Sequence, residues 1–167
     1  MSIEYYRKSP LKRMSSAAIL LDENSNMIIV KPTYKGNTWL LPGGTINLDE
    51  SPVDACIREV IEETCLKINA KKLLVVEYNK LSVRYTESLF FIFYGGILSK
   101  EDINKINLPP DELEDYKFVS QNELQNYMNK KMLKRIEYCL KALEDNSTIY
   151  LENQKLALYV DQNEVRN

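Results

Sequence analysis

Four glutamates and one arginine stand at short intervals in the middle of the chain, and their types suit the binding of a metal ion. Carboxylates three and four residues apart share one face of a helix, where they repel each other unless a cation joins them. Mg²⁺ or Mn²⁺ suits such a group because hard cations take carboxylate oxygens and keep positions open for water and substrate phosphates. Hydrolysis of a diphosphate is the chemistry that this arrangement predicts, and its residues are Glu50, Arg58, Glu59, Glu62 and Glu63.

A helix from Pro52 to Thr64 is the element that must position these groups. Ser51 suits the N-cap, Pro52 suits the first helical position, and Asp54 resembles a capping-box partner. At 100° per residue, the three helical glutamates share one sector. We expect the opposite side to pack against the core, with Val53, Cys56, Ile57, Val60 and Thr64.

The segment before this helix supplies two further features. Gly43 and Gly44 end an apolar strand in a turn, where glycine lets the backbone come close to a ligand or ion. Glu50 arrives from the following loop and could add a carboxylate to the same cluster. On the helix, Arg58 can reach Glu62 at i+4 and hold it in place.

At this point the segment resembles a known family motif, the box of the Nudix hydrolase superfamily. That motif reads G, five residues, E, seven residues, R-E-apolar-x-E-E-x-G-apolar, and it is matched from Gly44 to Leu66 with one exception. Cys65 stands in place of the last glycine. Asn47 and Asp49 also differ from looser preferences in the loop, where an acid and a glycine are frequent.

The resemblance implies a role for each residue of the motif. Arg58 would orient the acidic cluster, and the catalytic base, which differs among family members, would be Glu62 or Glu63. Glu50 would support the cluster or bind a further ion. The Mg²⁺ or Mn²⁺ ligands would be Glu59, Glu62 and Glu63, helped by the carbonyl of Gly43 or Gly44. The implied activity is metal-dependent cleavage of a diphosphate bond in a nucleoside diphosphate linked to another moiety.

Cys65 raises the alternative of a catalytically weak or inactive module that binds a nucleotide-type ligand. The family glycine ends the helix, where a left-handed conformation is common and costs a non-glycine residue roughly 1–2 kcal/mol. Cys65 is not one of the expected metal ligands. We therefore interpret it as a tolerated change at the helix end, with the inactive module as the alternative.

Candidate substrate-binding residues lie outside the motif. Glu112 and Asp115 precede an apolar strand at offsets where related proteins often place an acid of the site, although a solvated acidic loop explains them equally well. Lys31 ends a strand where relatives often carry a base facing phosphates, and an ordinary strand-end lysine is the alternative. Three aromatic residues could stack on a nucleobase, although packing is the favoured interpretation: Trp39, Tyr34 and Tyr85.

Composition excludes several classes of site and partner. The 167 residues contain no histidine, which rules out His-based zinc sites, Ser-His-Asp triads and Cys-His dyads. A net charge of −2 and a pI near 5.4 give no general attraction to nucleic acid or anionic membranes. One basic cluster is interpreted as the solvated face of a helix, namely Lys130, Lys131, Lys134 and Arg135.

The cysteines and the apolar segments indicate a cytoplasmic protein. Cys56 and Cys139 fall on apolar helix positions and are expected to be buried thiols, as in a reducing compartment. The longest apolar run, Leu89 to Leu98, is too short to cross a bilayer. A small nucleotide-type molecule is thus the expected partner, and a homodimer is possible.

The remaining patterns predict one α+β domain over residues 1–167, a Nudix-like α/β/α sandwich with a mixed central β-sheet. A second helix from Lys130 to Glu144 would close it, and about 147–167 would add a terminal hairpin that could cover a sheet edge or pair with another subunit. A helix is also expected to open near Gln121. The expected strands are Ser15 to Asp22, Met27 to Lys31, Trp39 to Leu41, Leu73 to Asn79, Glu87 to Gly95, Lys117 to Ser120, Thr148 to Glu152 and Lys155 to Val160.

Overall fold

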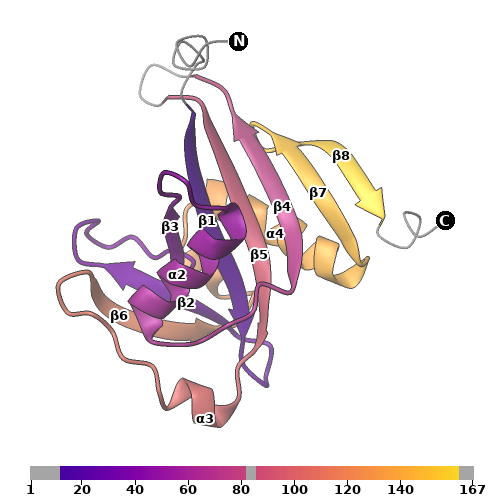
Figure 1. The fold of residues 1–167 in the computed structure, drawn as a ribbon. Helices are drawn as coiled ribbons and strands as arrows, with labels where there is room; N and C mark the ends of the chain where they lie inside the picture. The colour runs from indigo at the N-terminus through magenta and orange to yellow at the C-terminus, as the bar shows by residue number, and fades with distance from the viewer. Residues whose placement is uncertain (1–11, 82–85, 162–167) are drawn as a thin grey trace.

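The protein folds around one mixed β-sheet, and the computed structural model describes residues 12–81 and 86–161 of it (Figure 1). The strands are β1 (Arg13–Leu21), β2 (Met27–Pro32), β3 (Gly43–Thr45), β4 (Lys72–Asn79), β5 (Ser88–Ile97), β6 (Leu113–Val119), β7 (Ser147–Glu152) and β8 (Lys155–Asp161). The helices are α2 (Pro52–Thr64), α3 (Lys100–Ile103) and α4 (Lys130–Glu144), with a 3₁₀ turn η1 (Leu124–Asn126). The predicted α+β class is confirmed.

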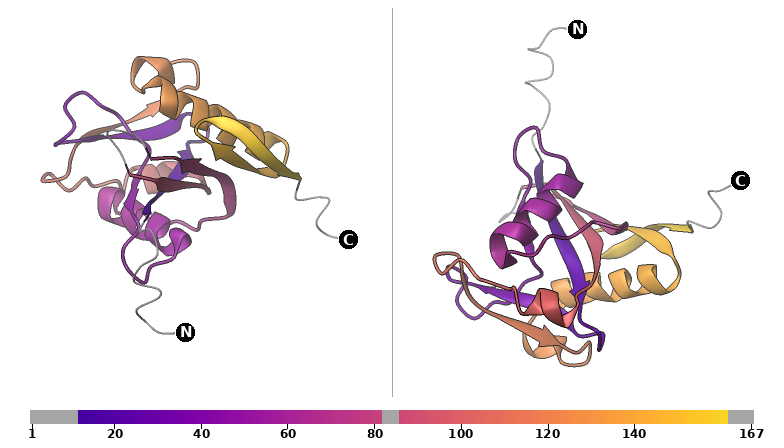
Figure 2. Two further views of the ribbon diagram at one scale, coloured as in Figure 1. Left: turned by 90° about the horizontal axis from the view of Figure 1, so that it is seen from above. Right: turned by 60° about the horizontal axis from the view of Figure 1, so that its bottom comes forward.

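The sheet contains both parallel and antiparallel pairs. Its strand order is β6-β2-β1-β5-β4-β7-β8, and β3 pairs separately with β1. The β1–β5 and β4–β7 pairs are parallel, whereas the other pairs are antiparallel. Helices α2 and α4 lie on opposite faces of this sheet, as the view from above makes clear (Figure 2).

Alternate residues of β1 explain the two layers. Ala18 and Leu20 pack in one core cluster with Cys56 and Val60 of α2, whereas Ala17 and Ile19 pack in the other with residues of α4. Successive strand residues point to opposite faces, so an almost continuous apolar strand serves both cores. This central strand therefore fixes α2 and α4 relative to each other.

Helix α2 begins and ends where the local signals place it. The Ser51 hydroxyl accepts the backbone N–H of Asp54 at 3.1 Å, and Pro52 opens the first turn. At the other end Cys65 adopts the left-handed conformation, with φ of 61°. The buried residues differ slightly from the expectation, because Ala55 is buried and Val53 is exposed.

The terminal hairpin extends the sheet instead of standing apart from it. β7 pairs in parallel with β4, so it covers the edge that β4 would otherwise present. β8 becomes the outer strand, and the hairpin turns at Asn153 and Gln154, both with positive φ. Of the two roles predicted for this hairpin, the covering of an edge is confirmed.

Several elements differ from the sequence-based expectations. The segment Trp39 to Leu41 forms only an isolated bridge, between Leu40 and Val30, and the helix expected near Gln121 is the short turn η1. β6 begins at Leu113, several residues earlier than expected, because it pairs along the whole of β2. None of the helices in the described part of the chain is long and apolar enough to cross a bilayer.

Candidate active site

A pocket of about 530 Å³ lies between the acidic side of α2, strand β3 and the start of α4. Three carboxylates and three cationic side chains line it. Its lining includes Glu59, Glu63 and Glu112, together with Arg13, Lys35 and Arg135, and the aromatic ring of Tyr34. Such a mixture of charges in one hollow suits a ligand that carries both phosphates and a metal ion.

Gly43 and Gly44 lie in strand β3, which pairs with β1, so the turn expected at these glycines is wrong. The strand brings the backbone against two of the glutamates. The Gly43 N–H donates to the Glu63 carboxylate at 2.8 Å. Gly43 has φ of +145°, and a Cβ there would collide with the β1 backbone at Ser16. A Cβ on Gly44 would lie 2.5 Å from the Glu59 carboxylate. Gly43 is therefore required for β3 to lie against β1, and Gly44 leaves room for the Glu59 carboxylate.

Glu63 is held in a setting that disfavours its charge. Burial raises the pKa of Glu63 to about 8, and repulsion from Glu59 and Glu112 adds to this, against the opposing hydrogen bond from Gly43. The pKa of Glu59 is also raised, first by burial. Within the described residues, Glu63 has no ion-pair partner, so a bound cation would relieve the repulsion.

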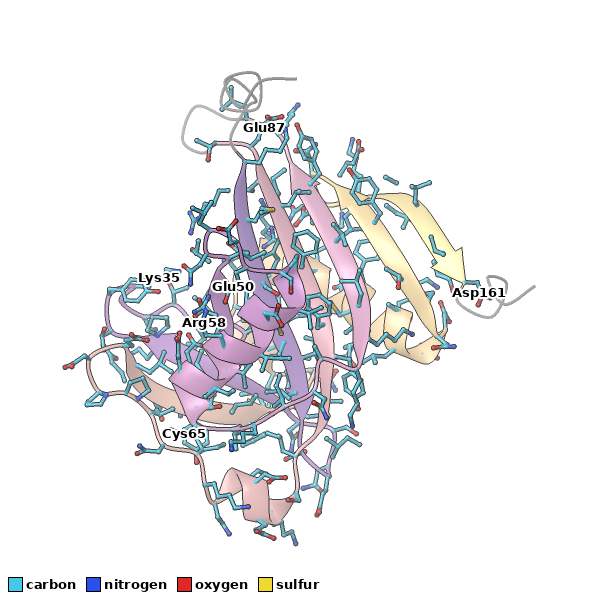
Figure 3. The ribbon with its side chains drawn as sticks, in the orientation of Figure 1. Lys35, Glu50, Arg58, Cys65, Glu87 and Asp161 are labelled. Atoms are coloured by element: carbon cyan, nitrogen blue, oxygen red, sulfur yellow. The ribbon has the colours of Figure 1, made fainter. Side chains whose placement is uncertain are left out.

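The guanidinium of Arg58 binds three acids of the motif, and Figure 3 labels it beside one of them, Glu50. It donates to both oxygens of Glu50, at 2.6 and 2.9 Å, and to Glu59 and Glu62 at 2.8 Å each. A further bond at 3.0 Å reaches the Thr45 carbonyl. The bidentate pair lowers the pKa of Glu50 to about 2, with help from the Asn47 N–H. The predicted reach of Arg58 to Glu62 is confirmed.

The donor chemistry fits a hard divalent cation. Glu59 and Glu63 offer carboxylate oxygens inside the pocket, whereas Glu62 is about half exposed and turned to Arg58. The described residues contain no cluster of three or more metal-ligating side chains. Mg²⁺ is commonly held by one or two carboxylates, with waters and substrate phosphates completing its shell, so two converging acids suffice.

Only some of the candidate substrate residues lie at the pocket. Glu112 lines the pocket, whereas Lys31 pairs with Glu114 at 2.6 Å and lies outside its lining. Asp115 lies 3.5 Å from Lys117 on the surface of β6. Trp39 is only 5% exposed and packs edge-on against the ring of Tyr127, as the packing interpretation predicted.

The aromatic candidates other than Trp39 have separate outcomes. Tyr34 is exposed at the pocket rim, where burial and then Glu63 raise the pKa of its hydroxyl. Tyr85 lies outside the described residues. The two cysteines expected in the core, Cys56 and Cys139, are both buried and free.

Three cationic residues of the pocket were missed by sequence reasoning. Lys35 lies in the loop after β2, and the only signal in the sequence was the neighbouring Gly36, which marks a turn. Arg13 gave no signal, because only strand pairing brings it to the site. Arg135 was assigned to a solvated helix face, and that prediction is wrong: its side chain is 12% exposed and pairs with the buried Glu77.

Comparison with known proteins agrees with the geometry of the site. A family model described as NUDIX domain matches residues 11–142. A MutT-like protein from Streptomyces ambofaciens is 36% identical over 110 residues, which cover 64% of this chain and 70% of that protein. The matched range contains strand β3, α2 and the pocket-lining part of α4, and it ends before the terminal hairpin.

Solved structures share the same arrangement of sheet and helices. A UDP-X diphosphatase superposes with a TM-score of 0.70 at 20% identity, covering 90% of this chain and 75% of that one. The NUDIX domain of Shewanella oneidensis NrtR complexed with ADP ribose gives 0.67 at 18% identity, covering 86% and 99%. At these identities the likeness concerns the fold alone.

Proposed function

This chain belongs to the NUDIX domain family and is a Nudix hydrolase that acts on pyrophosphate bonds. We propose that it is a metal-dependent pyrophosphohydrolase of nucleoside diphosphate derivatives. The substrate would be a nucleoside diphosphate linked to another moiety. The observation that carries the proposal is the pair Glu59 and Glu63, which face one pocket with raised pKa values. Desolvated acids of this kind cluster at functional sites.

Mg²⁺ or Mn²⁺ would be held by Glu59 and Glu63, with Glu62 and a glycine carbonyl as further oxygen ligands. A bound divalent ion supplies charge stabilisation at the phosphoryl oxygens and an acidified water. Arg58 contributes indirectly, because its bonds to Glu50 and Thr45 tie the loop to α2. Lys35, Arg13 and Arg135 line the same pocket and would orient the substrate phosphates.

Of the two candidates for the catalytic base, the geometry favours Glu63. It lines the pocket beside Glu59 and Glu112, whereas Glu62 does not. The Gly43 N–H holds one carboxylate oxygen and so fixes its direction. The Glu62 carboxylate instead accepts a hydrogen bond from Arg58 and does not line the pocket.

The second candidate function is a module that binds a nucleotide-type ligand without cleaving it. The fold likeness to the NrtR NUDIX domain complexed with ADP ribose supports this alternative. One observation argues against this alternative. Cys65 adopts the left-handed conformation in which the family has a glycine, and Glu59 and Glu63 still line the pocket. Tight binding without cleavage would distinguish the module from the enzyme.

A phosphate-release and nucleotide-release screen tests the proposal. ADP-ribose, a UDP-sugar, a nucleoside triphosphate and a dinucleoside polyphosphate would each be offered with Mg²⁺ and with Mn²⁺. We expect cleavage of at least one diphosphate compound, lost in EDTA and in the Glu63→Gln and Glu62→Gln variants. Activity that persists in chelator, or wild-type rates in the variants, would contradict the proposal.

A further inference from the structure

A second pocket, of about 570 Å³, continues from the first one, and its charge is of one sign. The two share Arg13, Ser15, Phe90 and Arg135 as lining residues. Among the described residues that line the second pocket, four are cationic and none carries a carboxylate: Arg13, Lys80, Lys131 and Arg135. The first pocket, called the acidic pocket because it holds Glu59, Glu63 and Glu112, therefore adjoins a basic one.

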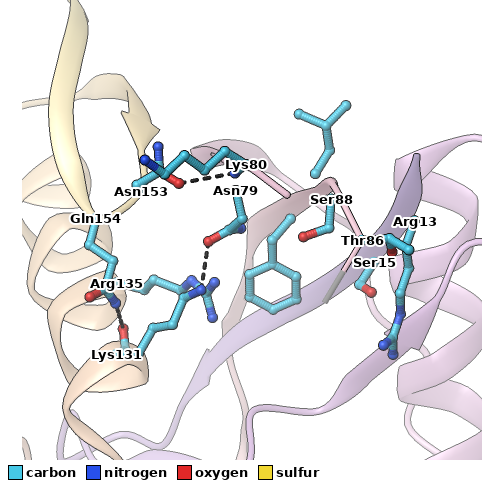
Figure 4. A pocket seen from close by; sticks show the side chains of 12 residues that line it. Arg13, Ser15, Asn79, Lys80, Thr86, Ser88, Lys131, Arg135, Asn153 and Gln154 are labelled. Carbon is cyan, nitrogen blue, oxygen red and sulfur yellow. Dashed lines mark hydrogen bonds between the residues drawn. The ribbon is translucent and has the colours of Figure 1, made fainter. Parts of the chain in front are cut away.

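The cationic groups come from both sides of this basic pocket (Figure 4). Lys131 and Arg135 project from α4 on one side, whereas Arg13 comes from β1 on the other. The Lys131 ammonium is held by the Asn79 side chain at 2.6 Å, and within the described residues neither Lys131 nor Arg13 forms an ion pair. Burial, and then the nearby Arg135, lower the pKa of Lys131, so an anion between them would stabilise its charge.

The terminal hairpin builds one wall of this pocket. Asn153 and Gln154, the two residues of its turn, both line it. The Gln154 side chain donates to the Lys131 carbonyl at 3.2 Å, and its backbone N–H donates to the buried Glu77 at 2.8 Å. Glu77 in turn pairs with Arg135. The hairpin thus helps to orient the pocket's cations.

The lining is rich in donors of a kind that suits phosphate. Besides the four cations, hydroxyls and amides line the space, from Ser88, Thr86, Asn79 and Gln154 among others. The three terminal oxygens of a phosphate can accept several such bonds at once, whereas a carboxylate offers only two oxygens. Arg135 also lies 4.7 Å from the Phe90 ring, which keeps the guanidinium beside the boundary of the two pockets.

We propose that the basic pocket is a subsite for a second phosphate of the substrate, remote from the diphosphate that is cleaved. The inference rests on the proposed function, because it places the cleaved bond in the acidic pocket. The preferred substrates are then nucleoside diphosphate derivatives with an additional phosphate monoester or a longer phosphate chain. The hairpin that forms one wall of this pocket lies beyond the residues that the family model matches.

The first experiment measures the binding of inorganic phosphate to the full chain in EDTA, by titration calorimetry. Lys131→Gln removes one charge-assisted partner and is expected to weaken binding about 10-fold or more. Lys130→Gln is the matched control, because both lysines are exposed on α4 and Lys130 does not line the pocket. Absence of phosphate binding, or an equal loss in both variants, would overturn the proposal.

The second experiment distinguishes a phosphate on the substrate from free phosphate. The ratio of kcat/KM for ADP-ribose 2′-phosphate to that for ADP-ribose is measured with Mg²⁺ in the same three proteins. We expect a ratio well above one in wild type, reduced about 10-fold in Lys131→Gln and retained in Lys130→Gln. An unchanged ratio with intact phosphate binding would overturn the proposal in favour of a free-phosphate site. Should neither compound nor any other diphosphate be cleaved, the proposed function fails, whereas the binding experiment still tests the pocket.

Discussion

Two groups of glutamates lie on different sides of α2, and they differ in what neutralises them. On the outer side Arg58 binds Glu50 and Glu62, it also donates to Glu59, and the pKa of Glu50 falls to about 2. On the pocket side burial and neighbouring acids raise the pKa of Glu63 to about 8. Within one short motif, the surroundings thus lower the pKa of one glutamate and raise that of another.

This difference suggests a division of labour within the motif. The Arg58 cluster joins the loop at Glu50 to the helix and stabilises the fold without an added ion. Glu63, which has no ion-pair partner among the described residues, is costly to the metal-free protein and gains from a cation, whereas Glu59 is partly neutralised by Arg58. The pocket therefore lowers the free energy of unfolding of the metal-free protein, and the hydrogen bonds of Arg58 raise it. Such a loss of stability is common at sites that bind a ligand.

The largest expected effect is on turnover. Glu63→Gln should reduce kcat by about 10³-fold or more, because it removes both a proposed metal ligand and the proposed base. Steady-state assays with the substrate found in the screen measure it. Glu144→Gln, on the exposed part of α4, is the control and should retain activity. Near-normal turnover in Glu63→Gln would contradict the proposed role of Glu63 as metal ligand and base.

The same substitution should have the opposite effect on stability without metal. The folded pKa of Glu63 is raised above its ordinary value of 4.5, so its contribution is fully favourable below pH 4.5 and is lost as the pH rises through about 8. In EDTA at pH 8.5, Glu63→Gln is expected to be more stable than wild type by roughly 1–3 kcal/mol. Urea denaturation from pH 5 to 9 measures this. Equal stability of both proteins across that range would contradict the assignment.

The outer side should respond in the reverse direction. Arg58→Lys keeps the charge but loses the fork that binds Glu50, Glu59 and Glu62 together. We expect a loss of about 1–2 kcal/mol in the free energy of unfolding in EDTA, since hydrogen bonds to charged groups are lost. Urea titration measures it beside Lys67→Gln, an exposed control. A stabilised Arg58→Lys protein would mean that the cluster is not structural.

The smallest expected effect is at Cys65, which belongs to neither group of carboxylates. Its left-handed conformation, φ of 61°, favours glycine. Cys65→Gly should raise stability by about 0.5–1 kcal/mol, since relief of strain is partly offset by the greater freedom of glycine in the unfolded chain. Thermal melts with and without Mg²⁺ should shift alike. A change in kcat at constant stability would instead connect this helix end to the chemistry.

Local signals in the sequence predicted the elements that carry the motif. The bounds of α2 and α4 agree with the expectation because caps and apolar periodicity are properties of neighbouring residues. The link between Arg58 and Glu62 follows from helical spacing in the same way. What local patterns could not give is the partner of a side chain from a distant segment.

The basic residues illustrate that limit. Arg135 carries a charge on a helix whose pattern indicates a solvated face, yet Glu77, 58 residues away in the sequence, pairs with it inside the fold. Arg13 reaches the pocket only because β1 lies beside β5. Long-range strand pairing also decided that the hairpin would meet β4 and form one wall of the basic pocket.

The most direct test of the account is the affinity of the metal site. Mn²⁺ binding would be measured by the electron paramagnetic resonance signal of the free ion at pH 8.5, in wild type, Glu63→Gln and Glu144→Gln. The account predicts binding to wild type and to Glu144→Gln, weakened at least about 10-fold in Glu63→Gln, since one of two pocket carboxylates is lost. Equal Mn²⁺ affinity in all three proteins would contradict the claim that the pocket pair is held for a divalent cation.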